Sequence, residues 1–127
     1  MANILVVEDD KDLNAAYKII LESAKHHVKT AFNGLEALEI LKTYTPDLIL
    51  LDLLMPVMGG LELLEKYRLK NHPEVQVLIF TNMENSPEVS KAYALGATRC
   101  IIKSWTAPQN LNKVVNDTLK ETSKVAG

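Results

Sequence analysis

The sequence predicts a doubly wound α/β domain built on one five-stranded parallel sheet. Short aliphatic runs alternate with helical patterns five times, and the run at 48–51 is apolar at every position. A strand of that kind is typical of the middle of a parallel sheet, where both faces are covered. Right-handed crossovers then place helices on both faces of the sheet. A five-strand chain of this size favours the strand order 2-1-3-4-5, which is flavodoxin-like.

The first half of the chain shows three strands and two helices. Spacings of three and four between apolar residues indicate the helices, and short branched-aliphatic runs indicate the strands. The second strand is the weakest, and Pro46 follows the second helix as a breaker. In order, the elements are a strand at Ile4–Val7, a helix carrying Leu13, Ala16, Tyr17, Ile20, Leu21 and Ala24, a strand at His26–Ala31, a helix opening at Asn33-Gly34 with Leu35, Leu38 and Leu41 on one face, and a strand at Leu48–Leu51.

The second half repeats the alternation. Pro73 is expected to stop the third helix. Ser86 is expected to cap the fourth helix, with Pro87 at its first helical position. Gly96 suits the left-handed conformation that follows the last turn of that helix. The elements are a helix with Leu61, Leu64 and Tyr67 that runs to about Asn71, a strand at Val75–Phe80, a helix with Ala92, Tyr93 and Leu95, a strand at Arg99–Ile102, and a helix with Leu111, Val114, Val115, Thr118 and Leu119.

The composition of the chain excludes several classes of function. The chain has 127 residues with 14 basic and 16 acidic side chains, and this balance gives no electrostatic footprint for direct binding of nucleic acid or an anionic membrane. Its one cysteine cannot form an internal disulfide, and no apolar run approaches the ~20 residues that span a bilayer. No secretory signal opens the chain, so we expect a cytoplasmic protein. The domain is expected to cover 1–122, with 123–127 a frayed tail.

Polar side chains follow four of the five strands at one edge of the predicted sheet. Glu8 and Asp9 follow the first strand, Asp52 the third, Thr81 the fourth and Lys103 the fifth. Ligands of open α/β sheets bind outside this edge, and the first and third strands are neighbours in the expected order. The three acidic residues are therefore expected to meet in one crevice.

This crevice predicts metal-assisted phosphoryl chemistry. Carboxylates that converge without a basic partner repel each other, and Mg²⁺ relieves the repulsion through one or two carboxylates while it keeps its waters. A carboxylate beside Mg²⁺, with an ammonium and a hydroxyl nearby, is equipped to accept a phosphoryl group. Taken singly, each residue has a simpler interpretation: Asp52 as a turn residue, Glu8 and Asp9 as acids at a helix start, Thr81 and Lys103 as a strand-end hydroxyl and a solvated charge.

Four motifs resemble the receiver domain of two-component response regulators, over essentially the whole chain. They are I-L-V-V-E-D-D near the start, D-L-L-M-P-V-M-G-G in the middle, L-I-F-T before the fourth helix and G-A-T-R-C-I-I-K near the end. The resemblance is to a chemotaxis-regulator-like receiver. It implies a signalling switch phosphorylated on one aspartate, with Mg²⁺ as cofactor and a sensor histidine kinase or histidine phosphotransfer protein as donor. Since the sequence ends soon after its fifth helix, we expect a stand-alone receiver or one excised from a larger protein.

The resemblance also assigns roles to individual residues. Asp52 is implied to be the phosphoacceptor and also a metal ligand. Glu8 and Asp9 are implied to hold Mg²⁺, with Asp9 the more direct ligand, together with the backbone carbonyl of Leu54. Thr81 and Lys103 are implied to bind phosphoryl oxygens. Asp10 is then an extra acid outside the usual pair. The downstream partner is expected to bind the face formed by the fourth helix, fifth strand and fifth helix.

Three positions depart from the family pattern, and two variable positions bear on the lifetime of the phosphoryl group. Ser104 replaces the usual proline after the lysine, so we expect a trans bond there and a rearranged loop before Trp105. Cys100 replaces the rotating aromatic of the family switch, and Asn82 is bulkier than the usual small residue. Leu54 and Met83 occupy the two positions that tune phosphoryl lifetime. Because both are apolar, slow autodephosphorylation is expected.

Two other functions remain open. A receiver-like module that binds a partner without phosphorylation is the alternative, and the substitutions at residues 82, 100 and 104 favour it. A metal-dependent phosphatase is the third, although its D-x-D motif on the first strand is absent here. His26 and His27 resemble a metal pair, but neighbours in a strand point to opposite faces, so we expect both to be surface residues.

Overall fold

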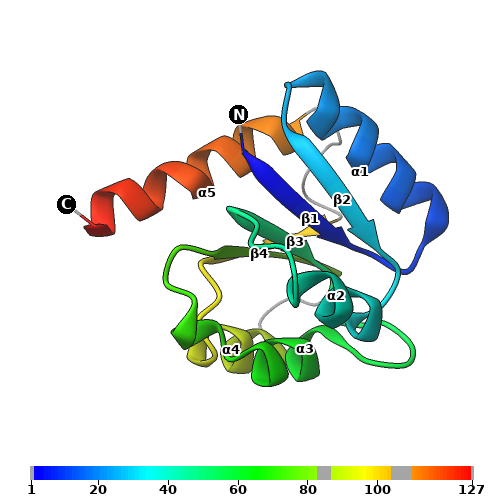
Figure 1. Cartoon of the computed structure of the whole chain (residues 1–127), viewed down its shortest axis with the longest axis vertical. Helices are drawn as coiled ribbons and strands as arrows, with labels where there is room; N and C mark the ends of the chain where they lie inside the picture. The colour runs from blue at the N-terminus through cyan, green and yellow to red at the C-terminus, as the bar shows by residue number, and fades with distance from the viewer. Residues whose placement is uncertain (1, 83–86, 104–109, 127) are drawn as a thin grey trace.

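The computed structural model describes residues 2–82, 87–103 and 110–126 and contains one parallel sheet (Figure 1). The strand order is β2-β1-β3-β4-β5, as predicted. Val7 pairs with Leu51 and Leu51 with Ile79, so the three central strands end at nearly the same level. The strands are β1 Asn3–Val7, β2 His27–Ala31, β3 Leu48–Leu51, β4 Gln76–Thr81 and β5 Arg99–Ile102.

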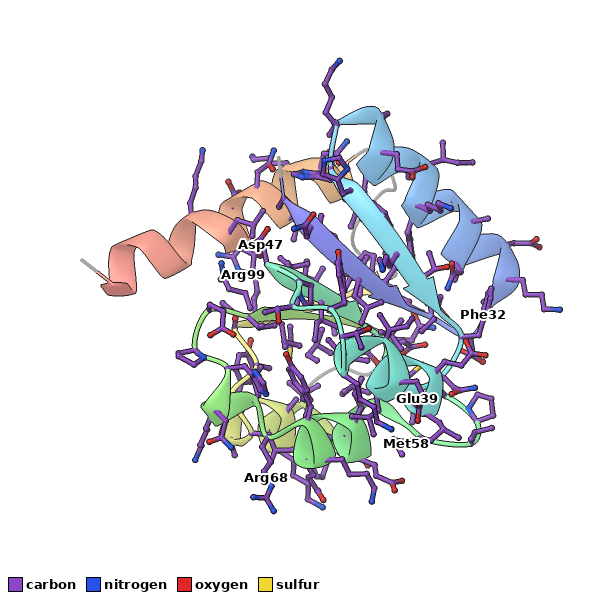
Figure 2. All side chains as sticks on the ribbon, viewed as in Figure 1. Phe32, Glu39, Asp47, Met58, Arg68 and Arg99 are labelled. Carbon is purple, nitrogen blue, oxygen red and sulfur yellow. The ribbon has the colours of Figure 1, made fainter. Side chains whose placement is uncertain are left out.

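Five α-helices in the described part of the chain cover the two faces of this sheet. Figure 1 shows α1 and α5 on one face and α2, α3 and α4 on the other. Alternate residues of β1 serve the two layers, since Ile4 and Val6 pack toward α1 and α5 while Leu5 and Val7 pack toward α2 and α3. Side chains fill both interlayer spaces (Figure 2). The helices are α1 Lys11–Ser23, α2 Gly34–Leu41, α3 Gly60–Tyr67, α4 Pro87–Ala94 and α5 Leu111–Ala126.

The third helix is shorter than predicted. It ends at Tyr67 because Arg68 adopts a left-handed conformation with φ of 55°, and the 3-10 helix Leu69–Asn71 continues the chain. Gly96, with φ of 110°, has the conformation expected of it after α4. The cap predicted at Ser86 lies outside the described residues.

The C-terminal helix reaches Ala126 and therefore includes most of the segment expected to fray. Fraying is a motion, so that expectation stays a prediction. The trans bond expected after Lys103 and the loop expected before Trp105 fall in 104–109, outside the described residues. No helix in the described part of the chain is both long and apolar enough to cross a membrane.

His26 is buried, so the prediction that both histidines lie on the surface was wrong for this residue. Its Nδ1 atom accepts a hydrogen bond of 3.0 Å from the N–H of Ala2, while His27 is exposed at the start of β2. One histidine is buried and its neighbour is exposed, which is the alternation expected along an extended chain. The burial follows from local packing, because the N–H of His26 bonds the carbonyl of Leu21 and folds the turn back onto α1.

Acidification is expected to destabilise the fold through His26. Burial lowers the pKa of this histidine below 6.5, and the positive N-terminus lowers it further. The unfolded chain then binds the proton more readily, so the stabilising contribution is complete above pH 6.5 and is lost as the pH falls through the folded pKa. Urea unfolding between pH 7.5 and pH 5 measures this loss.

The matched variants are His26→Asn, which keeps an acceptor near the Nδ1 position, and His27→Asn on the surface. The first should flatten the pH dependence relative to wild type, and the second should leave it unchanged. Comparison with wild type removes the contribution of other titrating groups. Equal pH dependence in all three proteins would contradict the prediction.

Candidate functional site

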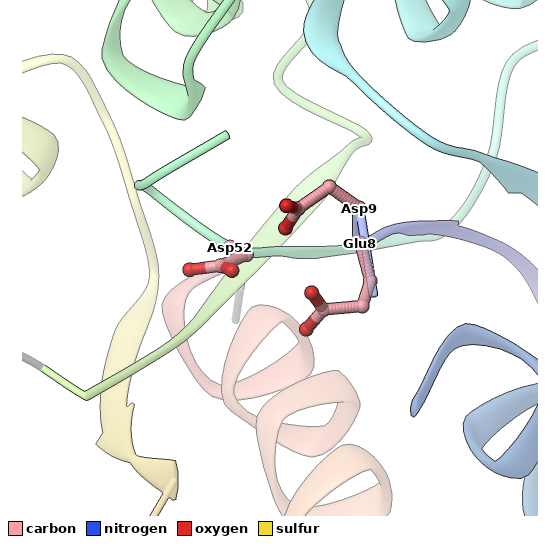
Figure 3. A group of neighbouring side chains, drawn as sticks. All are labelled: Glu8, Asp9 and Asp52. Carbon is pink, nitrogen blue, oxygen red and sulfur yellow. The ribbon is translucent and has the colours of Figure 1, made fainter. Parts of the chain in front are cut away.

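Three carboxylates converge where β1 and β3 end. Glu8 and Asp9 follow β1, Asp52 follows β3, and one oxygen from each lies within 4.8 Å of the others. Their carboxylates reach into one space in Figure 3. The strand pairing produces this arrangement, because the N–H of Asp52 bonds the carbonyl of Val7 at 3.1 Å and so keeps the two strand ends level. The predicted meeting of these residues is confirmed.

Lys103 lies among these carboxylates. Its Nζ atom is 2.5 Å from Oε1 of Glu8 and 3.1 Å from Oδ2 of Asp52. Burial by itself lowers the pKa of Lys103, but the bond to Glu8 and the charge of Asp52 outweigh it and leave the pKa raised, so the ammonium is charged. Lys103 was predicted near these acids as a binder of phosphoryl oxygens. In the structure it also pairs directly with two of the carboxylates and neutralises part of their charge.

Glu8 is held in place from several sides. Its side chain is buried, and its Oε2 atom accepts a hydrogen bond of 3.1 Å from the N–H of Asp10. Burial raises the pKa of Glu8, whereas the bonds from Lys103 and Asp10 act to lower it, and burial is the larger effect. The negative charge of Glu8 is therefore favoured by the nearby ammonium of Lys103.

Asp10 starts α1. Its Oδ1 atom accepts hydrogen bonds from the N–H groups of Asp12 and Leu13, at 2.9 and 3.0 Å. This is an N-cap, so Asp10 performs the helix-start role that was the simpler interpretation of Glu8 and Asp9. The side chains of Glu8 and Asp9 therefore do not cap the helix and belong to the acidic cluster.

Sequence reasoning missed Asn14. Its Nδ2 atom donates to the carbonyls of Glu8 and Ala31, both at 3.0 Å, and so ties the ends of β1 and β2 to α1. Asn14 is buried together with Tyr17 and Leu21, which follow it at helical spacing. A polar residue within the buried stripe of an amphipathic helix was the signal that could have revealed it.

The loop after Asp52 is packed tightly against the site. The N–H of Leu54 donates to Oδ1 of Asp52 at 3.3 Å, and the N–H of Gly60 donates to the carbonyl of Leu53 at 3.0 Å. A Cβ atom on Gly60 would lie 2.7 Å from the carbonyl oxygen of Asp52. Leu54, two residues after Asp52, is 60% exposed.

Thr81 and Lys103 lie on neighbouring strands at the same edge. Thr81 ends β4, pairs with Ile102 of β5 and is completely buried. Lys103 follows Ile102 directly, so the predicted proximity of these two residues to the acidic edge agrees with the register. Their phosphoryl-binding roles stay predictions, as does the ligand role of the Leu54 carbonyl. Asn82 is exposed, and Met83 lies outside the described residues.

The chain belongs to the response regulator receiver domains, because the model of that family matches residues 4–116. Its fold agrees: a response regulator receiver domain protein (CheY-like) from Methanospirillum hungatei superimposes with a TM-score of 0.88 and 29% sequence identity, over 98% of each chain. The predicted family and fold are confirmed.

Curated relatives match as well. The chain is 35% identical over 112 residues to the Regulator of RpoS of Escherichia coli, over 88% of this chain and 33% of that protein. It is 27% identical to the chemotaxis protein CheY of Halobacterium salinarum, over 87% of this chain and 92% of that protein. The chain spans about a third of the first relative's length, so the activities of that whole protein do not transfer directly.

Membership of the receiver-domain family defines the general function of the chain. The chain is a signalling domain homologous to CheY and other response regulators, consistent with a phosphorylation-dependent switch. Receiver domains typically use Mg²⁺, and they interact with histidine kinases or phosphotransfer proteins and with downstream targets. The cluster of Glu8, Asp9 and Asp52 is in keeping with that chemistry.

Proposed function

We propose that Asp52 accepts a phosphoryl group from a phosphohistidine and that its phosphorylated state changes the binding of a partner protein. The observation that carries this proposal is the convergence of Asp52 with two further acids and one lysine at the end of β3. A carboxylate oxygen of Asp52 forms the new O–P bond while the N–P bond of the donor breaks, and the electron pair of that bond returns to the imidazole.

The acidic cluster fits a hard divalent cation such as Mg²⁺. All of its donors are carboxylate oxygens, and Asp9 is exposed at the open side of the cluster. Glu8, Asp9 and Asp52 would hold the ion together with the carbonyl oxygen of Leu54, with Asp9 a more direct ligand than Glu8. When bound, Mg²⁺ supplies positive charge against the negative charge of the incoming phosphoryl group.

Lys103 and Thr81 would bind the transferred group. Lys103 bonds Oδ2 of Asp52 in the unphosphorylated protein, and the phosphoryl group offers the same ammonium a more negative acceptor. The hydroxyl of Thr81, one position before Lys103 in the strand register, would donate to another phosphoryl oxygen.

The surface around the acidic edge supports docking of a protein donor. Leu54 and Val57, in the loop after β3, are 60% and 74% exposed, and Phe32 and Leu35, at the start of α2, are 38% and 48% exposed. Gly34 bonds the carbonyl of Met58 at 2.8 Å, so the two segments are joined. A sensor kinase or phosphotransfer protein with an apolar surface around its histidine would fit these exposed apolar side chains.

The principal alternative is a receiver that binds its partner without phosphorylation. The bonds from Lys103 to Glu8 and Asp52 favour it, because they already neutralise part of the acidic charge without a metal. Acetyl phosphate as donor separates the two functions, since a pure binding module incorporates no phosphate.

Phosphate incorporation tests the proposal. Wild type with Mg²⁺ should incorporate one phosphoryl group, whereas Asp52→Asn, or wild type with EDTA, should incorporate none. Asp10→Asn is the matched control, because asparagine also caps helices and this position lies outside the three-carboxylate cluster. Incorporation into the Asp52 variant equal to that of wild type would refute the proposal.

Leu54 is expected to prolong the phosphorylated state. Its backbone N–H bonds Asp52, and its exposed, apolar side chain cannot hydrogen-bond a water that attacks the phosphoryl group. Leu54→Asn supplies such a group and should accelerate dephosphorylation about ten-fold. Leu54→Met, which stays apolar, should decay at the wild-type rate. Decay of radiolabelled protein measures both, and equal rates in all three proteins would contradict the prediction.

A further inference from the structure

A tyrosine of α4 holds the backbone of the edge strand β5. The N–H of Cys100 donates to the hydroxyl oxygen of Tyr93 at 2.9 Å. β5 is the last strand of the sheet, and an edge strand presents N–H groups that have no neighbouring strand to bond. The Tyr93 hydroxyl satisfies one of these groups and joins α4 to β5.

The same hydroxyl also meets the side chain of Cys100. A hydrogen bond between the two acts to lower the pKa of the thiol, although burial has the larger effect and leaves that pKa raised. Tyr93 as a residue is 47% exposed. One partly exposed tyrosine thus bonds both the backbone and the side chain of a single strand residue, which fixes its hydroxyl while the rest of the residue stays on the surface.

β5 is consequently held at two points. Three residues after Cys100, Lys103 bonds Glu8 and Asp52, so about 10 Å of extended strand separates the tyrosine contact from the acidic cluster. A phosphoryl group on Asp52 would draw the ammonium of Lys103 from Oδ2 to a phosphoryl oxygen farther from β3. This shift would act on the end of β5, because Lys103 directly follows that strand.

We propose that the hydroxyl of Tyr93 transmits this adjustment to α4 and so couples the phosphorylation state of Asp52 to the surface of that helix. Tyr93 is a positioning residue in this role, since it acts through Cys100 and Lys103. The inference rests on the proposed function, because it requires a phosphoryl group or a mimic of one at Asp52. Coupling of this kind needs an element that both sites bias, and in this proposal that element is β5, which contacts Tyr93 through Cys100 and directly precedes Lys103.

Tyr93→Phe removes the hydroxyl and keeps the ring. Tyr44→Phe is the matched control, because the Tyr44 hydroxyl is buried with no hydrogen-bond partner within the described part of the chain. In the first variant the amide of Cys100 should exchange with solvent about ten-fold faster, as expected for the loss of one net hydrogen bond. The control should retain the wild-type rate.

The decisive measurement is the change in amide chemical shifts on addition of Mg²⁺ and beryllofluoride. Wild type and the Tyr44 variant should respond both around Asp52 and along α4. The Tyr93 variant should keep the response around Asp52 and lose at least half of the response in α4. An undiminished α4 response in that variant overturns the inference and leaves the proposed function intact. No response around Asp52 in wild type overturns both.

Discussion

Replacing Lys103 with glutamine is expected to tighten Mg²⁺ binding about ten-fold while it slows phosphorylation of Asp52 about a hundred-fold. The opposite signs arise because the lysine has two roles. Without a metal, its ammonium bonds the carboxylates of Glu8 and Asp52, which are two of the expected metal ligands. During transfer, it would neutralise the phosphoryl oxygens.

The effect on Mg²⁺ follows from charge. The Nζ atom is 3.1 Å from Oδ2 of Asp52, so its positive charge opposes a second cation at the same oxygens. Glutamine keeps a hydrogen-bond donor, on a side chain that is one bond shorter, and removes the charge. Two like charges near a protein surface interact by several kcal/mol at most, and screening reduces this to roughly the 1.4 kcal/mol that corresponds to ten-fold.

Isothermal titration with Mg²⁺ and the rate of phosphate incorporation from acetyl phosphate measure the two effects. Lys66→Gln is the matched control, because Lys66 forms an exposed ion pair of 3.9 Å with Glu62 on α3. That control should change neither quantity. Weaker Mg²⁺ binding in the Lys103 variant, or an unchanged phosphorylation rate, would show that the lysine does not have these two roles.

The acidic site could be predicted from the sequence because strand ends are easy to locate. Four aliphatic residues followed by Asp52 mark the end of a buried strand, and the strand order then places Glu8 and Asp9 beside it. The strand ends follow from the local pattern of apolar residues, and the neighbouring strands follow from a strand order that is common to this type of fold. The confirmed convergence of the three carboxylates needed no knowledge of individual side-chain contacts.

Contacts between distant residues could not be predicted in the same way. The bonds of Lys103 to Glu8 and Asp52 join residues 95 and 51 positions apart, and they depend on where one flexible side chain settles. The burial of His26 depends on a turn that returns to Leu21, and the end of α3 depends on the left-handed Arg68. None of these conformations has a periodic signature in the sequence.

Gly60→Ala is expected to destabilise the fold by about 2 to 3 kcal/mol, although alanine is the better helix former. Gly60 is the first residue of α3, where propensity alone would favour alanine by about 1 kcal/mol. A Cβ atom there would lie 2.7 Å from the carbonyl oxygen of Asp52 and 2.9 Å from Cα of Leu53. Both neighbours are backbone atoms, so relief of the overlap has to move the chain that carries Asp52.

The same displacement should weaken Mg²⁺ binding, since the Leu54 carbonyl and the Asp52 carboxylate belong to the segment that moves. Gly59→Ala is the graded control, because its Cβ atom would lie 3.0 Å from the carbonyl oxygen of Leu53 and 3.9 Å from its next neighbour. Urea unfolding and Mg²⁺ titration should therefore rank wild type first, the Gly59 variant second and the Gly60 variant last. If the Gly60 variant is as stable as wild type, helix propensity outweighs the overlap, and the loop after β3 is looser than its contacts imply.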